Sequence, residues 1–398
     1  MSSSVTIVFE VRPSGNTTGM KSRWFASFVT LGTLAVVIIA ASLAGSGAVL
    51  DNNRYVSPTG SDAALGGSDS PWKSFCKAID RLQPGQTLIV RDGVYRENCT
   101  QWNGTTKGPV SLTPGTLAAP VRVEAAAGAN PVVEGLVWIR AMDYWTFSNI
   151  DVRWSNTQLP PSVIVDTMTQ SQPAYTPTPT DHMVRLQDGT GWTWENSEIS
   201  GAESYANILV GSVQSGRPAN WTLRGNCIHD TDPDANNNSD DQNHNIYVNG
   251  KSSNGAGLIT RNILFNAPNG ENIKLAGGAS PEGTNSVTIS YNTMYHAKKN
   301  VLIGWSSKGN ILERNLMVDA ISTNKVLRAY QLTGSGNVAR YNYWFDDQSS
   351  MQAPDNFPYL SVSESNNVKG DPKFDSVTSC SGFKPQTAAA QAYGAFAP

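Results

Sequence analysis

Thr-Arg-Asn-Ile at residues 260–263, Ser-Tyr-Asn-Thr at 290–293 and Glu-Arg-Asn-Leu at 313–316 are copies of one phrase, a short β-rich run centred on an asparagine. Successive copies from residue 196 onward lie 23 to 36 residues apart. Repeats of that length indicate a solenoid, a propeller or another array built from one recurring unit. The remaining copies centre on Asn149, Asn196, Asn226 and Asn342.

A second phrase alternates with the first, as in Asn-Ile-Tyr-Val at 245–248 and Asn-Ile-Lys-Leu at 272–275. Each period therefore holds two short strands bounded by Gly, Asn and Ser. One coil of a solenoid cannot bury its apolar side alone, whereas stacked coils bury a continuous core. Asparagines at a fixed corner can bond from coil to coil through their amides. The repeat predicts an all-β fold, a single right-handed parallel β-helix with an asparagine scaffold; a β-propeller would need longer, multi-strand repeats with Gly and Trp signatures.

The composition fits strands and turns better than helices. The chain has 398 residues, a formal net charge of −3 and only 15% charged residues, and it contains 35 glycines. Glycine, asparagine and serine favour turns, and long amphipathic helical patterns are absent beyond the N-terminal segment. A general nucleic-acid binder would carry far more positive charge, so we expect no nucleic-acid partner.

An apolar run at 24–43 follows two basic residues and is followed by Ser-Gly-Ala at 46–48, which has the form of a signal-peptidase site. The run is also about as long as a short membrane span, so an uncleaved anchor remains open. We expect residues 1–48 to be an N-terminal extension with a signal peptide or membrane anchor, and residues 49–398 to be the β-helix domain. The domain is then expected to be secreted or extracellular, monomeric, and attached to a membrane only if the segment is retained.

The four cysteines lie in the expected β-helix domain, at Cys76, Cys99, Cys227 and Cys380. An exported chain can hold disulfides. Cys76 and Cys99 are close in sequence and form the best candidate pair, whereas Cys227 could be disulfide-bonded or a buried free thiol. The chain has no CxxC motif, so a structural zinc site is not expected.

Phrases at both ends of the domain resemble a known superfamily. They read Tyr-Val-Ser-Pro-Thr-Gly-Ser-Asp at 55–62, Ser-Pro-Trp-Lys-Ser-Phe at 70–75 and Gly-Asp-Pro-Lys-Phe at 370–374. They resemble the pectate-lyase-like β-helix superfamily and are most similar to its branch of family 9 polysaccharide lyases and chondroitinase-B-like lyases. The resemblance implies that a short helix at 73–82 caps the N-terminal end. The same scaffold carries hydrolases, esterases and non-catalytic surface proteins, so the fold does not decide the activity.

An acidic loop interrupts the repeat between Asn226 and Asn245. Carboxylate and amide oxygens alternating in a loop suit Ca²⁺, which takes about six to eight oxygen ligands. The spacing loosely follows an EF-hand loop, although Ala235 replaces the usual glycine and no flanking helices are expected. A solvated acidic turn is the alternative. The five candidate metal ligands are Asp230, Asp232, Asp234, Asp240 and Asp241.

The next coil brings a lysine close to this loop. In the strand at 272–275, Ile273 and Leu275 should point inward, so Lys274 points outward in one column with Tyr247 of the preceding coil. Adjacent coils carry leucines at the equivalent positions. A lone lysine on such a face is a candidate catalytic residue, with a solvent-facing strand lysine as the alternative.

The resemblance gives this arrangement a chemistry. In family 9 lyases a carboxylate cluster binds Ca²⁺, and a lysine on a following coil is the base. The resemblance therefore implies that Asp240 and Asp241 are the paired metal-binding acids and that Lys274 is the base. The family's further acid falls here near Asn243 or His244, a departure that weakens the assignment of Ca²⁺ as the cofactor.

The implied reaction is β-elimination on a uronate. The base takes the weakly acidic proton at C5, and Ca²⁺ on the adjoining carboxylate stabilises the developing negative charge. A lysine base must be neutral, which requires desolvation or a nearby cation. Tyr247 and His244 are candidate proton donors to the leaving oxygen. Substrate contacts are expected from Arg185, His229, Lys298 and Glu271.

The expected function is therefore Ca²⁺-assisted cleavage of an acidic, pectate-like polysaccharide by a secreted lyase. A glycoside hydrolase on the same scaffold is one alternative, because Asp240 or Asp241 with Glu271 could supply two carboxylates across a sugar. A non-catalytic, glycan-binding surface β-helix is the other alternative. Unsaturated products whose formation stops on chelation identify the lyase. Saturated products identify the hydrolase, and binding without turnover identifies the non-catalytic glycan-binding protein.

Overall fold

The computed structural model separates residues 1–50 from a compact second unit, Asp51–Pro398, and every described element lies in this second unit. The N-terminal extension expected at 1–48 therefore lies outside the described residues. Within the described part, no helix combines the length and the apolar character needed to cross a membrane. The structure describes residues 52–102, 107–153, 184–202, 205–211, 218–231, 243–250, 256–277, 282–322 and 325–398.

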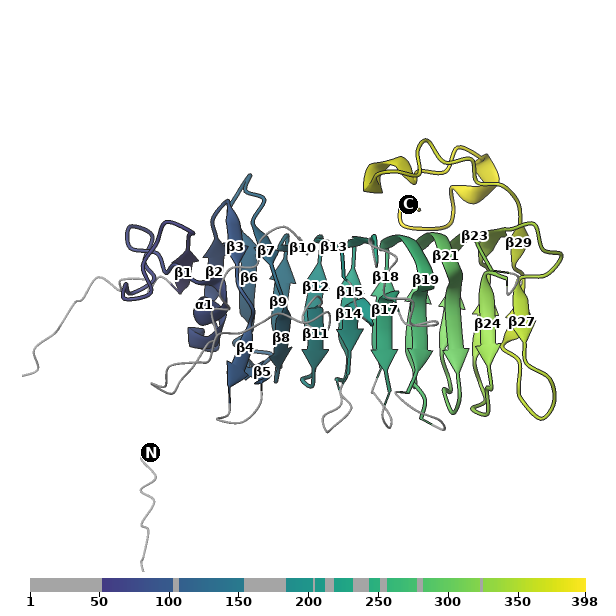
Figure 1. Cartoon of the computed structure of the whole chain (residues 1–398), viewed down its shortest axis with the longest axis horizontal. Helices are drawn as coiled ribbons and strands as arrows, with labels where there is room; N and C mark the ends of the chain where they lie inside the picture. The colour runs from purple at the N-terminus through teal and green to yellow at the C-terminus, as the bar shows by residue number, and fades with distance from the viewer. Residues whose placement is uncertain are drawn as a thin grey trace, which may run out of the picture. The chain divides into compact units, whose positions relative to one another are not determined.

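Short parallel strands, stacked coil upon coil, form the body of the second unit (Figure 1). In an 11-stranded sheet, Ile259 pairs with Leu223 on one side and with Ile289 on the other. All three side chains are fully buried, so the inner side of this sheet closes the core. Its strands are β1 (Asn53–Val56), β2 (Thr87–Val90), β6 (Val121–Ala125), β9 (Trp145–Ser148), β12 (Thr193–Glu195), β15 (Trp221–Arg224), β18 (Gly257–Thr260), β20 (Val287–Ser290), β22 (Ile311–Glu313), β25 (Val338–Arg340) and β28 (Ser363–Ser365).

An 18-stranded sheet supplies two further faces of the coils. The long strand β19 (Ile263–Ala276) pairs through its first part with β16 (Cys227–His229) and through its last part with β17 (His244–Asn249). The pairings are parallel except between β4 and β5. The other strands are β3 (Val94–Arg96), β4 (Thr100–Trp102), β5 (Lys107–Ser111), β7 (Val132–Glu134), β8 (Val137–Arg140), β10 (Asp151–Arg153), β11 (Val184–Gln187), β13 (Glu198–Ser200), β14 (Ala206–Val210), β21 (Thr293–Gly304), β23 (Leu316–Ala320), β24 (Leu327–Tyr330), β26 (Tyr343–Phe345), β27 (Gln352–Pro354) and β29 (Val368–Lys369).

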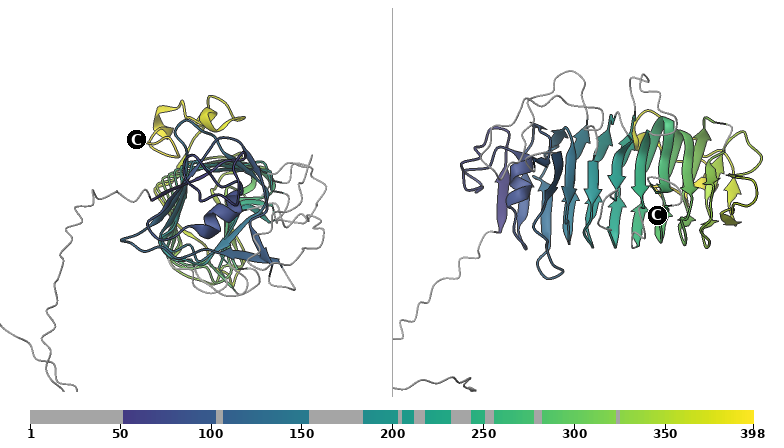
Figure 2. Two further views of the ribbon diagram at one scale, coloured as in Figure 1. Left: turned by 90° about the vertical axis from the view of Figure 1, so that its left-hand side faces the viewer. Right: turned by 60° about the horizontal axis from the view of Figure 1, so that its bottom comes forward.

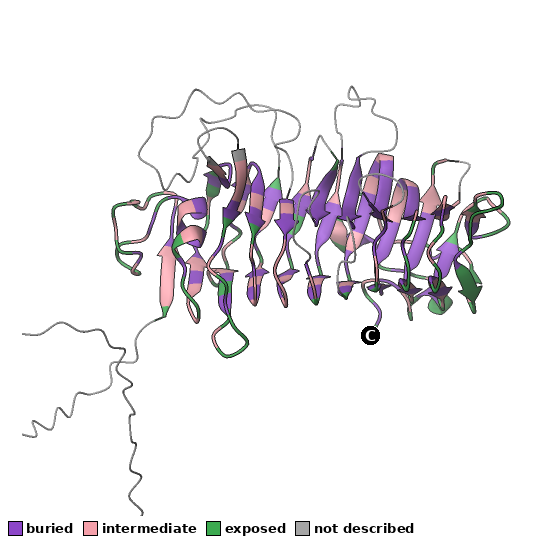
Figure 3. Ribbon diagram, turned by 90° about the horizontal axis from the view of Figure 1, so that it is seen from below, coloured by how far each residue is buried: buried purple, intermediate pink, exposed green. Residues whose placement is uncertain are grey.

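A ladder of asparagines runs along the corner between the two sheets. Each side-chain amide donates to the side-chain oxygen of the asparagine on the next coil, at distances of 2.9 to 3.1 Å. Buried residues continue through the whole stack (Figure 3), so these amides satisfy one another away from water. The predicted parallel β-helix with its asparagine scaffold is confirmed. The rungs are Asn226, Asn262, Asn292, Asn315, Asn342 and Asn367.

Two asparagines of the repeat are not rungs of this ladder, contrary to the prediction. The strand register puts Ser197, rather than Asn196, level with Asn226, and the amide of Ser197 donates to the Asn226 side chain over 3.1 Å. Asn149, which lies on the preceding coil, is aligned with Asn196. Both have left-handed backbone, with φ of 55° and 53°, a conformation that asparagine adopts more readily than most residues. These two residues therefore form the turn beside the ladder.

A second asparagine ladder lies at the corner inside the 18-stranded sheet. The amides of Asn207, Asn245 and Asn272 donate to the side-chain oxygen of the asparagine on the next coil at 2.9, 2.7 and 2.8 Å, and Asn300 is the last acceptor. This corner directly precedes the strand segment that carries Lys274. It therefore fixes the backbone at the edge of the candidate site.

The N-terminal end of the stack is closed by helix α1 (Phe75–Arg81), as predicted (Figure 2). The carboxylate of Glu97 accepts the backbone amides of Phe75 at 2.8 Å and Cys76 at 2.9 Å, and so caps the helix from a neighbouring coil. Burial raises the pKa of Glu97 to about 7, although the two amide bonds act against this. The expected disulfide between Cys76 and Cys99 is confirmed and ties the helix to the coils.

The C-terminal segment after β29 returns along the side of the solenoid (Figure 1). It contains the short 3₁₀ helices η2 (Cys380–Gly382) and η3 (Ala388–Ala390). A disulfide joins Cys380 to Cys227, across 153 residues of sequence, so Cys227 is not a free thiol. Phe383 is fully buried against Phe265, with ring centroids 4.9 Å apart. This segment therefore covers part of the outer face formed by β16 and the first part of β19.

Candidate active site

Lys274 lies on the outer face of β19, where the sequence predicts it. It pairs in register with Tyr247 on the preceding coil and with Leu302 on the following one, while Ile273 and Leu275 are fully buried in the core. Tyr247 and Leu302 are almost completely buried, but Lys274 is only partly buried. The predicted column is confirmed, and Lys274 presents an amine at a place where its neighbours present apolar or aromatic groups.

Tyr247 supports Lys274 from one side. Nζ of Lys274 lies 5.0 Å from the centroid of the Tyr247 ring, within the range of a cation–π contact. The Tyr247 hydroxyl donates to the carbonyl of Gly277 at 2.7 Å. Burial, aided by the charges of nearby glutamates, raises the pKa of Tyr247 well above its usual range. The hydroxyl is therefore a poor candidate for the proton donor that the sequence suggests, and the ring acts as a platform for Lys274.

A second column, three residues before the first on each strand, is polar and buried. It consists of His244, Glu271 and Lys299 on three successive coils, each followed by an asparagine of the second ladder. Nδ1 of His244 lies 2.7 Å from Oε2 of Glu271, and Nζ of Lys299 lies 3.5 Å from Oε1. The side chains are 1%, 0% and 1% exposed, respectively. One carboxylate thus lies between two basic groups inside the protein.

The charges of this column set the protonation of Glu271. Burial alone would raise the pKa of Glu271, but His244, Lys274 and Lys299 together lower it to about 2. Nδ1 of His244 is also 3.0 Å from the backbone nitrogen of Glu271. With a proton on Nδ1, His244 donates to the carboxylate of Glu271; without one, Nδ1 accepts from the backbone amide. Glu271 is therefore an anion on the same strand as Lys274, three residues before it.

These positions change the roles expected for His244 and Glu271. A side chain with almost no exposed surface cannot touch a polysaccharide, so Glu271 does not fit substrate binding and His244 does not fit proton donation to a sugar. The rival hydrolase loses Glu271 as its second carboxylate for the same reason. The sequence reasoning also missed Lys299 as a site residue. The sequence feature that could have revealed Lys299 is its position directly before a ladder asparagine. His244 and Glu271 occupy the same position on their coils.

His229, at the end of β16, and the adjacent Asp230 lie on a different outer face of the solenoid from Lys274. Nδ1 of His229 lies 2.9 Å from Asp230 and Nε2 lies 3.4 Å from Glu198, while the ring stacks on Phe265 with centroids 4.6 Å apart. Burial would lower the pKa of His229, but its bonds to the two carboxylates raise it to about 9. Both ring nitrogens are thus engaged by the protein, which does not favour the expected substrate-binding role.

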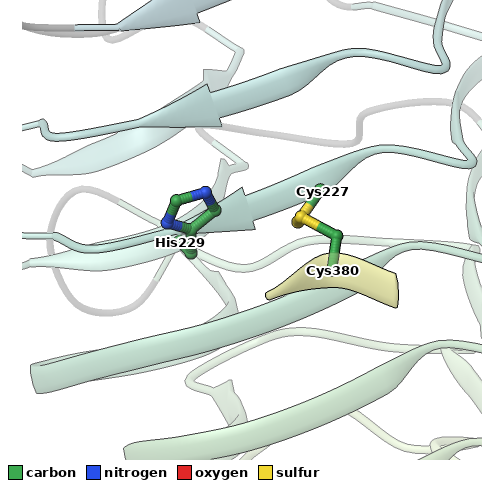
Figure 4. A group of neighbouring side chains, drawn as sticks. All are labelled: Cys227, His229 and Cys380. Carbon is green, nitrogen blue, oxygen red and sulfur yellow. A yellow bond between two sulfur atoms is a disulfide. The ribbon is translucent and has the colours of Figure 1, made fainter. Parts of the chain in front are cut away.

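Three ligand-type side chains meet beside the disulfide, as Figure 4 shows. Sulfur and nitrogen atoms of Cys227, His229 and Cys380 lie within 4.8 Å of one another. A transition metal would need the two sulfurs as thiolates, but they are bonded to each other in a disulfide. This cluster is therefore structural in the oxidised protein.

The expected calcium loop is described only at its two edges. Asp230 accepts hydrogen bonds from Asn266 and His229, and His244 contacts Glu271, so neither side chain is directed toward a shared ion. The described residues therefore do not form a calcium site by themselves. The other candidate ligands lie outside the described residues: Asp232, Asp234, Asp240 and Asp241.

Arg185 and Lys298 are the remaining basic residues that are expected to contact substrate. Arg185 pairs with Leu209, which itself pairs with Tyr247, so Arg185 lies in the column of Lys274, three coils before it. Its guanidinium carbon is 4.0 Å from the centroid of the Trp138 ring. Lys298 is partly buried, just before Lys299 on β21. The contact of Arg185 and Lys298 with substrate stays a prediction.

Two hollows lie on the face that the C-terminal segment covers, with volumes of about 390 and 350 Å³. The smaller hollow is lined by four carboxylates, which repel an anionic polymer, whereas the larger is lined by one, Asp230, which already accepts hydrogen bonds from His229 and Asn266. The smaller hollow therefore does not suit a uronate chain, and the face that carries Lys274 remains the candidate site. The carboxylates that line them are those of Asp230, Asp319, Asp346, Asp347 and Asp371.

Comparison with known proteins agrees with this fold. No family model matches the chain. Over 126 residues, the chain is 28% identical to the pectate lyase PEL9 of Emericella nidulans; the match covers 26% of this chain and 28% of the relative. The chain thus matches little more than a quarter of the length of that curated relative.

Two solved structures are similar in fold at low sequence identity. Pectate lyase Pel9A is 14% identical, with a TM-score of 0.47, and the match covers 80% of this chain and 78% of that one. The alginate lyase from Paenibacillus sp. str. FPU-7 is also 14% identical, with a TM-score of 0.47, and the match covers 74% and 91% of the two chains. The stacked coils and the capped N-terminal end, together with the partial match to a pectate lyase, agree with the resemblance of this chain to the pectate-lyase-like β-helix superfamily.

Proposed function

We propose that this protein is a secreted polysaccharide lyase that cleaves a uronic-acid-containing, pectate-like polysaccharide by β-elimination, with Lys274 as the base. The observation that carries the proposal is the partly exposed Lys274 amine in a column whose neighbours, Tyr247 and Leu302, are buried. The partial identity to a pectate lyase supports the substrate class. The buried Glu271 argues against the hydrolase alternative.

Lys274 is a cation beside Glu271 in the resting protein. In the proposed reaction, Lys274 loses that proton through desolvation by the bound substrate and the charge of Ca²⁺, and the neutral amine then takes the proton at C5 of the uronate. The electron pair of that C–H bond forms the C4–C5 double bond, and the bond from C4 to the glycosidic oxygen breaks. The leaving oxygen keeps the electron pair of the broken C4–O bond and takes up a proton from water, so one product carries an unsaturated uronate. Proton transfer by a positioned side chain typically contributes about 10²- to 10⁴-fold to a rate.

The residues behind Lys274 orient it. The face of Tyr247 restricts where the amine can lie, and the anion of Glu271 on the same strand holds His244 and Lys299 in place. These four are positioning residues, because they act through Lys274 and do not touch the sugar. Arg185 and Lys298 are proposed to bind substrate carboxylates, which guanidinium and ammonium groups recognise well.

We also propose Ca²⁺ as the cofactor, held by Asp240 and Asp241. Paired carboxylates are ligands that Ca²⁺ prefers, and a cation there would offset the charge of the substrate carboxylate. Removal of Ca²⁺ by a chelator should then abolish turnover, and added Ca²⁺ should restore it. Full activity in excess chelator would remove the metal from the proposal while leaving Lys274 in place.

The decisive experiment follows the near-ultraviolet absorbance of unsaturated product on pectate, alginate and a glycosaminoglycan. The wild-type chain should form this product on at least one uronate, and Lys274→Ala should lower the rate by about 10²-fold or more. Lys308→Ala, which removes an exposed lysine from a turn, is the matched control and should keep wild-type activity. The lyase proposal fails if no uronate gives unsaturated product. Lys274 loses its role if Lys274→Ala is as active as the control.

A further inference from the structure

A stripe of arginines and tyrosines runs along the corner just before the first asparagine ladder. Strand pairing aligns Arg261, Tyr291, Arg314 and Tyr341 on four consecutive coils. All four have left-handed backbone, with φ of 54° to 56°. Other coils carry Asn or Gly at this position, the residues that adopt this conformation at least cost; they are Asn149, Asn196, Gly225 and Asn366.

The four side chains stack in alternation. The guanidinium carbon of Arg261 lies 5.2 Å from the Tyr291 ring centroid, and that of Arg314 lies 5.8 Å from the centroids of both Tyr291 and Tyr341. An exposed cation–π contact contributes about 0.5–1 kcal/mol, whereas a left-handed non-glycine residue costs about 1–2 kcal/mol. The stacking alone does not offset the backbone cost, so stability does not explain this choice of residues.

The stripe faces solvent and carries positive charge. Arg261 and Arg314 are exposed, and Tyr341 is 44% exposed. Arg314 makes no ion pair with the described residues, and the nearest acid along the chain, Glu313, is paired with Arg340 at 2.8 Å. Arg261 donates to the backbone oxygen of Ala397 at 2.5 Å. Arg314 in particular offers N–H groups, held between two aromatic faces, to an external anion.

We propose that Arg261, Tyr291, Arg314 and Tyr341 form a second binding surface, for an anionic polysaccharide chain that lies along the solenoid axis. Sugar rings would pack on the tyrosine faces, and sugar carboxylates would bind the guanidinium edges. Adjacent coils are about 4.8 Å apart, close to the length of one sugar residue, so successive rungs can meet successive sugars.

This surface is separate from the site of Lys274. The stripe lies at the corner between the 11-stranded sheet and the first part of β19, whereas Lys274 lies on the last part of β19, beyond the second asparagine ladder. The surface therefore retains the protein on polymer without taking part in bond cleavage. The proposal takes only its choice of polymer, a polyuronate, from the proposed function.

Affinity electrophoresis through gels that contain polygalacturonate tests the surface without turnover, if Lys274→Ala is used as the background so that the polymer is not cut. The test variant is Arg314→Asn with Tyr341→Asn, because Asn is native at this position in other coils and accepts the left-handed backbone. The matched control is Arg96→Gln, which removes an exposed charge on an N-terminal coil.

The background protein should be retarded by polygalacturonate and not by the fully methyl-esterified polymer. The double Asn variant should bind about tenfold more weakly and Arg96→Gln should bind normally. With Lys274 intact, the Asn substitutions should leave turnover of a short oligouronate unchanged. Three results would contradict the binding surface. They are equal retardation of the double variant and its background, equal weakening by Arg96→Gln, and no retardation of the background protein. If no uronate gave unsaturated product, that result would contradict only the proposed lyase activity and not the binding surface.

Discussion

Glu271 is a buried anion in a fold whose other inward positions are mostly aliphatic. Its carboxylate contacts His244 and Lys299 across the coils, and Lys274 on its own strand adds a third basic group. Buried charges are costly unless they are paired, and loss of one partner leaves the others unpaired. The cluster is therefore better explained by a need to hold Lys274 than by a need for stability.

The first prediction at this scale concerns Glu271→Gln. Removal of the anion should destabilise the protein by about 3–5 kcal/mol at neutral pH, because the basic groups lose their partner. Glu271 has a folded pKa of about 2 against an ordinary value of 4.5, so its stabilisation is present above pH 4.5 and is lost as the pH falls toward 2.

Urea unfolding between pH 7 and pH 2 measures this directly. The wild-type free energy of unfolding should fall with a component between pH 4.5 and 2 that Glu271→Gln lacks. Glu313→Gln is a suitable control, because Glu313 is paired with Arg340 on the surface. Parallel pH profiles for the wild type and Glu271→Gln would contradict the assignment.

The sequence could predict Lys274 but not Lys299. Lys274 follows from period-2 alternation, since Ile273 and Leu275 fix the inward side of that strand. Lys299 lies at a corner where alternation stops, and basic residues in turns are usually solvated. Only the register between β19 and β21, which pairs Glu271 with Lys299, shows that the lysine is buried.

The asparagine ladder acts as one element, although its rungs come from distant parts of the sequence. Asn292 donates to the carbonyl of Ile259 at 2.9 Å and to the side chain of Asn315 at 3.0 Å, and its own oxygen accepts from Asn262. Each rung satisfies groups on the coils before and after it. A missing rung in the middle therefore leaves buried donors and acceptors unpaired on both neighbours.

The second prediction compares a central rung with the last one. Asn292→Ala should cost about 3 kcal/mol, since each unsatisfied buried group costs about 1–3 kcal/mol. Asn367→Ala should cost about 1 kcal/mol, because Asn367 is only partly buried and ends the ladder. Denaturant unfolding of the two variants checks the order. Equal losses would mean that the amides do not act as a buried ladder.

The repeat phrase predicted the ladder but misplaced its beginning. Asn149 and Asn196 match the phrase by residue type, whereas their turn places them one position earlier than the true rungs. Asparagine suits both the ladder and the left-handed turn, so residue type alone cannot separate the two. The same ambiguity concealed the stripe of Arg261 and Tyr291, because that position was read as part of the phrase.

The two ends of the described solenoid differ. Helix α1 and the disulfide from Cys76 to Cys99 close the first coils. The resemblance at 55–62 and 70–75 implied the helix, and the closeness of the two cysteines in sequence indicated the disulfide. The last coils end in the exposed strands β28 and β29, and the chain then turns back along the solenoid. The link from Cys380 to Cys227 could not be deduced from the sequence, since the two cysteines are 153 residues apart and only the folded coils bring them together.

The third prediction follows from this asymmetry. Stability in a solenoid is approximately a sum of coil and interface contributions, so an uncovered end should open locally before the whole molecule unfolds. Hydrogen–deuterium exchange should be fastest in β28 and β29 and slowest in the buried strands between β6 and β20. Cys380→Ser should raise exchange in the C-terminal segment and in β16, which that segment covers, but not in β2 beside α1. Uniform exchange along all strands, unchanged by Cys380→Ser, would mean that the coils unfold as one unit and that the returning segment does not stabilise β16 and the first part of β19 separately.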